Sequence, residues 1–267
     1  MSSIVTDQGI VHYEAYGRGQ PVILLHGWLG SWGYWLKTME ALKDEYRCYA
    51  LDFWGFGDSG KRRSSYELKD FVDLVDQFMG RLGIEAAPIV GHSMGGTVAI
   101  SLALAKPERV KRVIVVGSPI VGSSLNIFLR LAGKPWIAST VWKAPAALKL
   151  GIKVFSPFIV KDWPEWYKMI TRDLSSTTLE AFFTSISALH KTDLRQQLPS
   201  INAPIMGIYG IGDNVVEPSQ ANIIAKRAVL SRIKMMGGSR HFPMLDEPQA
   251  FITQLADFLS VEFAAAG

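Results

Sequence analysis

The chain has 267 residues, of which 48% are hydrophobic and 19% are charged, and its 28 basic and 24 acidic side chains give a net charge of +4. This composition supports a large buried core and excludes a disordered chain, while so small a net charge argues against a nucleic-acid-binding protein. The first residues lack the basic and apolar segments of a signal peptide, and no run of about 18 apolar residues occurs. We therefore expect a soluble, cytoplasmic protein, and the sequence does not set its oligomeric state.

Short apolar runs alternate with segments of helical periodicity over most of the chain. Residues 1–18 are expected to form a hairpin-like entry, residues 68–82 an amphipathic helix, and residues 251–259 a second one behind Pro248. The apolar runs are predicted to be strands buried on both faces; they lie at residues 21–27, 47–53, 87–91, 110–117 and 203–210, with a weaker run at 234–236. This alternation predicts an α/β fold, a mainly parallel, doubly wound sheet with helices on both faces.

Cys48 is the single cysteine and lies inside one of these apolar runs. One cysteine excludes an intramolecular disulfide and a thiolate metal cage. We expect Cys48 to be a small buried apolar residue rather than a nucleophile.

The alternation of strands and helices stops between residues 119 and 198, where prolines recur and the segments have helical periodicity. We predict a core domain of residues 1–118 and 199–267, interrupted by a helical cap at residues 119–198. The cap has ten basic and five acidic residues, and it therefore carries the excess positive charge of the chain. A solvated cap surface is the simpler explanation, and a weak contact with an anionic membrane surface is the alternative.

Within the cap, periodicity predicts one apolar helix face with Leu148, Ile152 and Phe155. Lys149 and Lys153 lie off that face. Asp162 and Asp173 also belong to the cap, and we expect both carboxylates to be solvated.

The segment Gly91-His-Ser-Met-Gly95 matches the pattern G-x-S-x-G. It follows the apolar run 87–91 directly, and a helical segment begins at Gly96, so Ser93 is expected on a tight strand-to-helix turn. Small neighbours allow the strand and helix to approach, and the hydroxyl then stands at the positive end of a helix. Ser93 is therefore the candidate nucleophile.

A serine nucleophile needs a base and a group that orients the base. His241 is the only one of five histidines in a loop that follows the final predicted strand, and it is the candidate base. Asp213 follows the run 203–210 and is the candidate orienting carboxylate, with Glu217 and Asp246 as alternatives.

On these residues the chain resembles the α/β-hydrolase fold superfamily, in its serine esterase or lipase-like branch. The order Ser93, Asp213, His241 matches the family's chain order, and His26-Gly27-Trp28 matches the family's His-Gly motif. The resemblance implies that the backbone N–H groups of Trp28 and Met94 form the oxyanion hole. His26 is expected to brace the loop, and residues 52–59 resemble the family's glycine-rich loop. No metal and no organic cofactor are expected.

The eight tryptophans fall into two groups, at residues 28–54 and 136–166. The candidates for lining an apolar substrate pocket are Trp28, Trp54, Trp136 and Trp142. We predict an enzyme, a carboxylesterase acting on small to medium apolar or aromatic esters through an acyl-enzyme on Ser93. A serine in place of an aspartate argues against the dehalogenase and epoxide hydrolase relatives. The alternatives are a carbon–carbon bond hydrolase of ring-cleavage products and a slow-turnover ligand receptor.

Overall fold

The computed structural model describes residues 2–61, 65–134, 136, 139 and 142–261. Eight strands form one sheet in the order β1-β2-β4-β3-β5-β6-β7-β8. The strands are β1 (Ser2–Thr6), β2 (Gly9–Tyr16), β3 (Gln20–Leu25), β4 (Tyr46–Leu51), β5 (Ala87–His92), β6 (Val110–Val116), β7 (Ile205–Gly210) and β8 (Ser231–Met236). All neighbours from β4 to β8 pair in parallel, and β1 and β2 form the antiparallel entry hairpin.

Every strand predicted from an apolar run is present. The middle of the sheet is buried on both faces: β7 has no exposed or half-buried residue, and Val22 to Leu25 of β3 are fully buried. A chain segment that is covered on both sides must be apolar throughout, which explains why continuous apolar runs marked these strands. Cys48 is buried in β4, as expected, and burial raises the pKa of its thiol to about 12.

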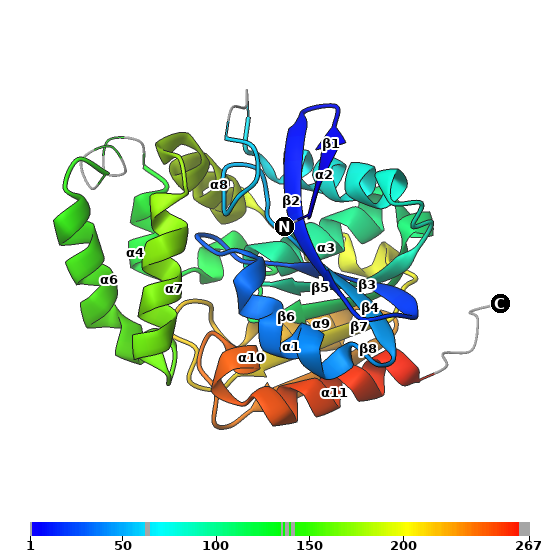
Figure 1. Ribbon diagram of the computed structural model, residues 1–267. Helices are drawn as coiled ribbons and strands as arrows, with labels where there is room; N and C mark the ends of the chain where they lie inside the picture. The colour runs from blue at the N-terminus through cyan, green and yellow to red at the C-terminus, as the bar shows by residue number, and fades with distance from the viewer. Residues whose placement is uncertain (1, 62–64, 135, 137–138, 140–141, 262–267) are drawn as a thin grey trace.

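Helices cover both faces of the sheet, as Figure 1 shows. The helices α1 (Leu36–Leu42) and α11 (Pro248–Ser260) pack on each other, and α2 (Leu68–Arg81) and α3 (Met94–Ala105) pack on each other on the opposite face. The remaining core helices are α9 (Gln220–Arg227) and α10 (Pro243–Asp246). The predicted fold class, a mainly parallel α/β sheet, is confirmed.

Residues 119–198 contain four described helices between β6 and β7. These are α4 (Ile127–Ala132), α6 (Pro145–Ile159), α7 (Trp163–Ser175) and α8 (Leu179–Lys191), and they lie together at one end of the sheet (Figure 1). The segment joins the core through bridges of Val121 with Asp193 and of Leu125 with Val216. We refer to residues 119–198 as the insertion. No helix in the described part of the chain is long and apolar enough to cross a membrane.

Candidate active site

Ser93 occupies the turn between β5 and α3, with φ +50° and ψ −116°. Within the described ranges only Leu29 and Ser93 are non-glycine residues with positive φ. Such a conformation is strained for a residue with a side chain and persists where the surroundings impose it. Here the N–H of Ser93 donates to the carbonyl of Val116 at 2.8 Å, which fixes the turn beside the end of β6.

Three glycines around Ser93 leave no room for a side chain. A Cβ at Gly91 would stand 2.2 Å from the backbone of Gly95, and a Cβ at Gly95 would stand 2.4 Å from the carbonyl oxygen of Leu25. At Gly96 a Cβ would be 2.0 Å from Oγ of Ser118. The two glycines of the motif are therefore required because β3, β5 and the start of α3 are in contact.

His241 and Asp213 form a buried pair, with Nδ1 of His241 2.8 Å from Oδ2 of Asp213. The other oxygen, Oδ1 of Asp213, accepts from the N–H groups of Val215 and Val216 at 2.8 and 3.0 Å. The backbone thus holds the carboxylate, the carboxylate holds Nδ1–H of the imidazole, and Nε2 is the nitrogen left to accept a proton.

The pair lies at the same edge of the sheet as Ser93. Gly117 directly follows β6, and a Cβ there would be 3.1 Å from the carbonyl oxygen of His241 and 3.4 Å from Oδ2 of Asp213. The ring of His92, the residue before Ser93, lies 4.7 Å from the ring of His241. Adjacent parallel strands end at one edge, so β5, β6 and β7 bring residues from distant parts of the chain together there.

The two alternative carboxylates have other partners. Glu217 is exposed and accepts a hydrogen bond from the hydroxyl of Ser219. Asp246 accepts from the N–H of Lys161 with one oxygen and from the N–H of Arg240 with the other, each at 2.7 Å. Of the three candidates, Asp213 is the one that the structure places against the imidazole of His241.

The loop after β3 lies against Ser93, the candidate nucleophile. A Cβ at Gly27 would be 2.8 Å from Nδ1 of His92 and 3.1 Å from Cβ of Ser93, so a larger residue there would displace these side chains. No described group accepts a hydrogen bond from the N–H of Trp28 or from that of Met94, the first residue of α3. Met94 directly follows Ser93 and Trp28 follows Gly27, which lies against Ser93, so both N–H groups belong to segments next to this serine, as the family resemblance implies for an oxyanion hole.

His26 braces this loop. Its Nδ1–H donates to the carbonyl of Gly27 at 2.7 Å, and its Nε2 accepts from the N–H of Phe53 at 2.9 Å. Complete burial lowers the pKa of His26, so the ring stays neutral and can both donate and accept. The structure therefore agrees with the bracing role expected from the sequence.

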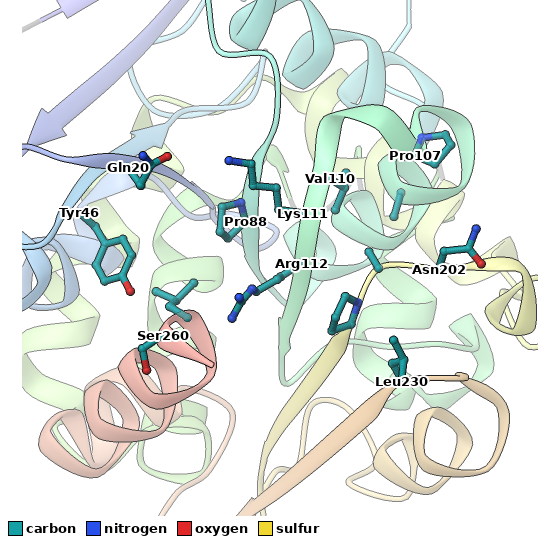
Figure 2. A pocket seen from close by; sticks show the side chains of 14 residues that line it. Gln20, Tyr46, Pro88, Pro107, Val110, Lys111, Arg112, Asn202, Leu230 and Ser260 are labelled. Carbon is teal, nitrogen blue, oxygen red and sulfur yellow. The ribbon is translucent and has the colours of Figure 1, made fainter. Parts of the chain in front are cut away.

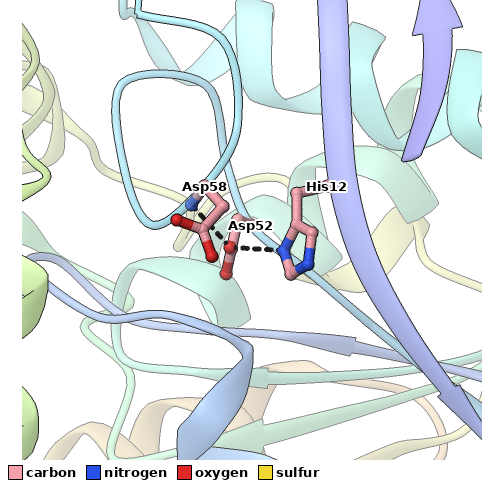
Figure 3. Close-up of side chains that lie close together, drawn as sticks. All are labelled: His12, Asp52 and Asp58. Carbon is pink, nitrogen blue, oxygen red and sulfur yellow. Dashed lines mark hydrogen bonds and ion pairs between the residues drawn. The ribbon is translucent and has the colours of Figure 1, made fainter. Parts of the chain in front are cut away.

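A buried carboxylate that the sequence did not mark, that of Asp52, also holds this loop; Figure 3 shows it between His12 and Asp58. Oδ1 of Asp52 accepts from the N–H of Trp32 at 2.7 Å, and Oδ2 accepts from Nδ1 of His12 at 2.8 Å and from the N–H of Asp58 at 2.9 Å. The hydrogen bond to Asp52 raises the pKa of His12. Although burial alone raises the pKa of Asp52, the hydrogen bond from His12 and the other donors hold it below its ordinary value.

His12, Asp52 and Asp58 are close enough to one another to be considered as metal ligands. Both oxygens of Asp52 and Nδ1 of His12 are already engaged in hydrogen bonds within the protein. The cluster therefore serves to hold the turn at residues 52–59 beside the loop after β3.

Asp173 of α7 connects the insertion to this loop. The hydroxyl of Ser31 donates to Oδ2 of Asp173 at 2.9 Å, and Nε and Nη2 of Arg172 both lie 3.1 Å from Oδ1. Asp173 is only 2% exposed, so the expectation of a solvated carboxylate was wrong. Burial raises the pKa of Asp173 to about 6, against the opposing effect of Arg172.

The insertion also holds the loop that carries His241. The N–H of His241 donates to the carbonyl of Ile159 at 3.1 Å, and Nη1 of Arg240 donates to the carbonyl of Val160 at 3.0 Å. Together with the bond from Lys161 to Asp246, these contacts fasten the end of α6 to the loop between β8 and α10.

The four tryptophans predicted to line a pocket lie in different environments. Nε1 of Trp28 donates to the carbonyl of Phe182 at 2.8 Å, and the ring of Phe182 lies 4.6 Å from Trp28 and 5.4 Å from Trp142. Trp54 is fully buried, whereas Trp136 is 70% exposed. Trp28, Phe182 and Trp142 thus form one aromatic group next to the loop after β3, and Phe182 had no sequence signal.

A surface cavity of about 730 Å³ lies at the opposite edge of the sheet (Figure 2). It is lined by residues at the beginnings of strands, among them Gln20, Tyr46 and Val110. Since Ser93 follows the end of β5, this cavity is separate from the candidate catalytic centre.

A family model described as alpha/beta hydrolase fold matches residues 20–248. The chain belongs to the alpha/beta hydrolase fold family. A pimeloyl-[acyl-carrier protein] methyl ester esterase of Vibrio campbellii is 27% identical over 258 residues, which cover 93% of this chain and 98% of the relative.

Two solved alpha/beta hydrolase fold structures resemble the whole chain. A thermophilic esterase from Thermogutta terrifontis has a TM-score of 0.84 at 21% identity, with 97% of each chain covered. A meta-cleavage product hydrolase from Pseudomonas fluorescens has a TM-score of 0.79 at 22% identity, again with 97% of each chain covered. At 21% and 22% identity, the similarity to these two structures establishes a shared fold.

Proposed function

We propose that this alpha/beta hydrolase cleaves carboxylic esters with small to medium apolar or aromatic groups through an acyl-enzyme on Ser93. The observation that carries the proposal is the buried bond from Nδ1 of His241 to Asp213, at the sheet edge where Ser93 sits on its strained turn. Esterases are among the similar proteins, at 27% and 21% identity. The aromatic group of Trp28, Phe182 and Trp142 supports an apolar substrate.

In the first half of the reaction, Nε2 of His241 takes the proton of Ser93 while Oγ attacks the ester carbonyl carbon. The carbonyl oxygen becomes negative and accepts from the N–H groups of Trp28 and Met94, which stabilise it by a few kcal/mol each, to order of magnitude. The intermediate collapses as the protonated imidazole gives its proton to the leaving alcohol. Asp213 keeps Nδ1 protonated throughout and stabilises the imidazolium.

In the second half, His241 takes a proton from water, and the resulting hydroxide attacks the acyl carbon on Ser93. The same oxyanion hole stabilises the second intermediate. The proton on His241 returns to Oγ, and the carboxylic acid leaves.

The test is hydrolysis of p-nitrophenyl esters from acetate to dodecanoate, combined with labelling by a fluorophosphonate. Ser93→Ala is expected to abolish both signals without loss of folding. Ser101→Ala is the matched control, because Oγ of Ser101 donates to the carbonyl of Thr97 inside α3. A folded protein that is labelled at Ser93 but turns over no ester would overturn the substrate class, and a ring-cleavage dienoate in the same panel tests carbon–carbon hydrolysis.

A further inference from the structure

Helix α6 is apolar on two sides, and only one of them is packed. Leu148, Ile152 and Ile159 pack against the core cluster. Leu150, Val154 and Phe158 are 62%, 57% and 59% exposed. Residues four apart share one face of a helix, so these three side chains form a continuous apolar stripe on the outer side. Phe155, which was expected on the packed face, is 46% exposed beside it.

The outer stripe is bordered by positive charge. Lys149 and Lys153 are exposed one turn apart on α6. Residues 127–161 contain six basic and no acidic residues, and the nearest acidic residues in the sequence are Glu108 and Asp162. A helix with an exposed apolar stripe and lysines at its border has the character of an interfacial helix.

The position of α6 in the molecule suits a flat surface. It forms the outer side of the insertion and packs along α7, and its C-terminal end reaches the loop of His241 (Figure 1). Its 15 residues extend for about 22 Å at the usual rise per residue.

We propose that the stripe of Leu150, Val154 and Phe158 docks on an anionic phospholipid surface. The apolar side chains enter the boundary between headgroups and acyl chains, and Lys149 and Lys153 contact the lipid phosphates. This interaction is distinct from the proposed hydrolysis and does not depend on it.

Charge favours a lipid surface over a second copy of the chain. A twofold contact would place the same positive border on both sides of the interface, and like charges would face each other. Anionic headgroups supply the opposite charge along the whole length of the helix.

The experiment is co-sedimentation of the full chain with vesicles of equal parts phosphatidylcholine and phosphatidylglycerol in about 0.15 M salt. Vesicles of phosphatidylcholine alone are the lipid control. We expect binding to the anionic vesicles and at least about tenfold weaker binding to the neutral ones.

Two variants test the two components of the site. Leu150→Ser with Val154→Ser is expected to weaken binding by at least about tenfold, because two partly inserted side chains are lost. Lys149→Gln with Lys153→Gln is expected to weaken it by about tenfold, because each basic residue near an anionic surface adds attraction. Phe158 is left unchanged because it lies at the end of α6 that contacts the core, next to Ile159, whose carbonyl accepts from the N–H of His241.

Matched controls distinguish binding through α6 from nonspecific hydrophobic or electrostatic binding. Val5→Ser with Val229→Ser removes two equally exposed apolar side chains elsewhere, and Lys69→Gln with Lys226→Gln removes two exposed lysines elsewhere. Both controls are expected to bind within about twofold of the unchanged chain, since they lie outside α6. Thermal unfolding and far-ultraviolet circular dichroism show that each variant is folded.

Three results would overturn the proposal. The first is no sedimentation with anionic vesicles, and the second is an equal loss in the α6 variants and their controls. The third is evidence for a partner other than lipid. One such result is a dimer, seen by ultracentrifugation without lipid, that Leu150→Ser with Val154→Ser converts to a monomer. Another is retention on polyglutamate that the same two substitutions abolish, while vesicles do not bind.

Discussion

Asp173 gives the stability of the protein a pH dependence that the structure specifies. Its carboxyl is buried in α7 against Ser31, and burial raises its pKa from an ordinary 3.8 to about 6. The neutral form is therefore favoured in the folded state by about 3 kcal/mol. Because the unfolded chain loses this proton at lower pH than the folded protein, the unfolded chain binds fewer protons between pH 4 and 6. The contribution of Asp173 to stability is then full below about pH 4 and is lost as the pH rises through about 6.

The perturbation that isolates this effect is Asp173→Asn, which keeps an oxygen for Ser31 and removes the titration. The free energy of unfolding is measured by urea denaturation of both proteins from pH 5 to pH 7. The value for the unchanged protein is expected to fall by about 1.3 kcal/mol relative to the variant over this range. This is the part of the roughly 3 kcal/mol that lies above pH 5.

Arg172→Gln provides an internal check, because the charge of Arg172 lowers the pKa of Asp173. Its loss should move the fall in stability to higher pH. A difference between the unchanged protein and Asp173→Asn that stays flat from pH 5 to 7, or that rises with pH, would refute the assignment of a raised pKa to this carboxyl.

Three further predictions concern Asp213, two glycines in different packing environments, and Asp52. Asp213→Asn is expected to lower kcat by about 10⁴ with the fold intact, because the N–H groups of Val215 and Val216 favour the amide orientation that turns its NH₂ group, not its oxygen, toward Nδ1 of His241. Steady-state kinetics check this, and retention of most activity would assign the role to another acid. Gly95→Ala should lower the free energy of unfolding by about 3 kcal/mol, since its Cβ would lie 2.4 Å from the backbone of β3. Gly151→Ala has open space around it in α6 and should instead raise the free energy of unfolding by nearly 1 kcal/mol, to order of magnitude. Asp52→Asn should cost about 2 kcal/mol in urea denaturation, because either orientation of the amide points its NH₂ group at a backbone N–H; an unchanged midpoint would mean that this carboxylate does not hold the loop.

The sheet and the strand-to-helix turn at Ser93 were predictable because local rules determine them. A strand covered on both faces must be apolar throughout, and a serine on a strand-to-helix turn needs small neighbours, so residues 87–96 carry their structure in the order of the sequence. The loop position of His241 and the strand end at Asp213 follow from the same topology. The structure then brings these two side chains to 2.8 Å, which spacing alone does not establish.

The supporting contacts were not predictable because their partners are far apart in the chain. Phe182 contacts Trp28 across 154 residues, and Ser31 meets Asp173 across 142. The sequence places Asp52 in a glycine-rich turn, but no local pattern indicates that its carboxylate accepts hydrogen bonds from three separate segments of the chain. Periodicity on α6 predicts that Phe155 is packed, but its side chain is 46% exposed. The prediction is wrong because both sides of this helix are apolar, and the pattern does not show which side is packed.

The hydrogen bonds from the end of α6 to the loop of His241 bear on how such a chain can be re-engineered. The N–H of His241, the proposed base, donates to the carbonyl of Ile159, and the side chain of its neighbour Arg240 donates to the carbonyl of Val160. A graft that exchanges the insertion for that of another hydrolase would therefore remove part of the backbone support of His241, the proposed base, together with the aromatic residues of the insertion. A chimera that keeps residues 159–161, Arg240 and Asp246 retains these hydrogen bonds. It should therefore change the substrate range while the position of His241 is preserved.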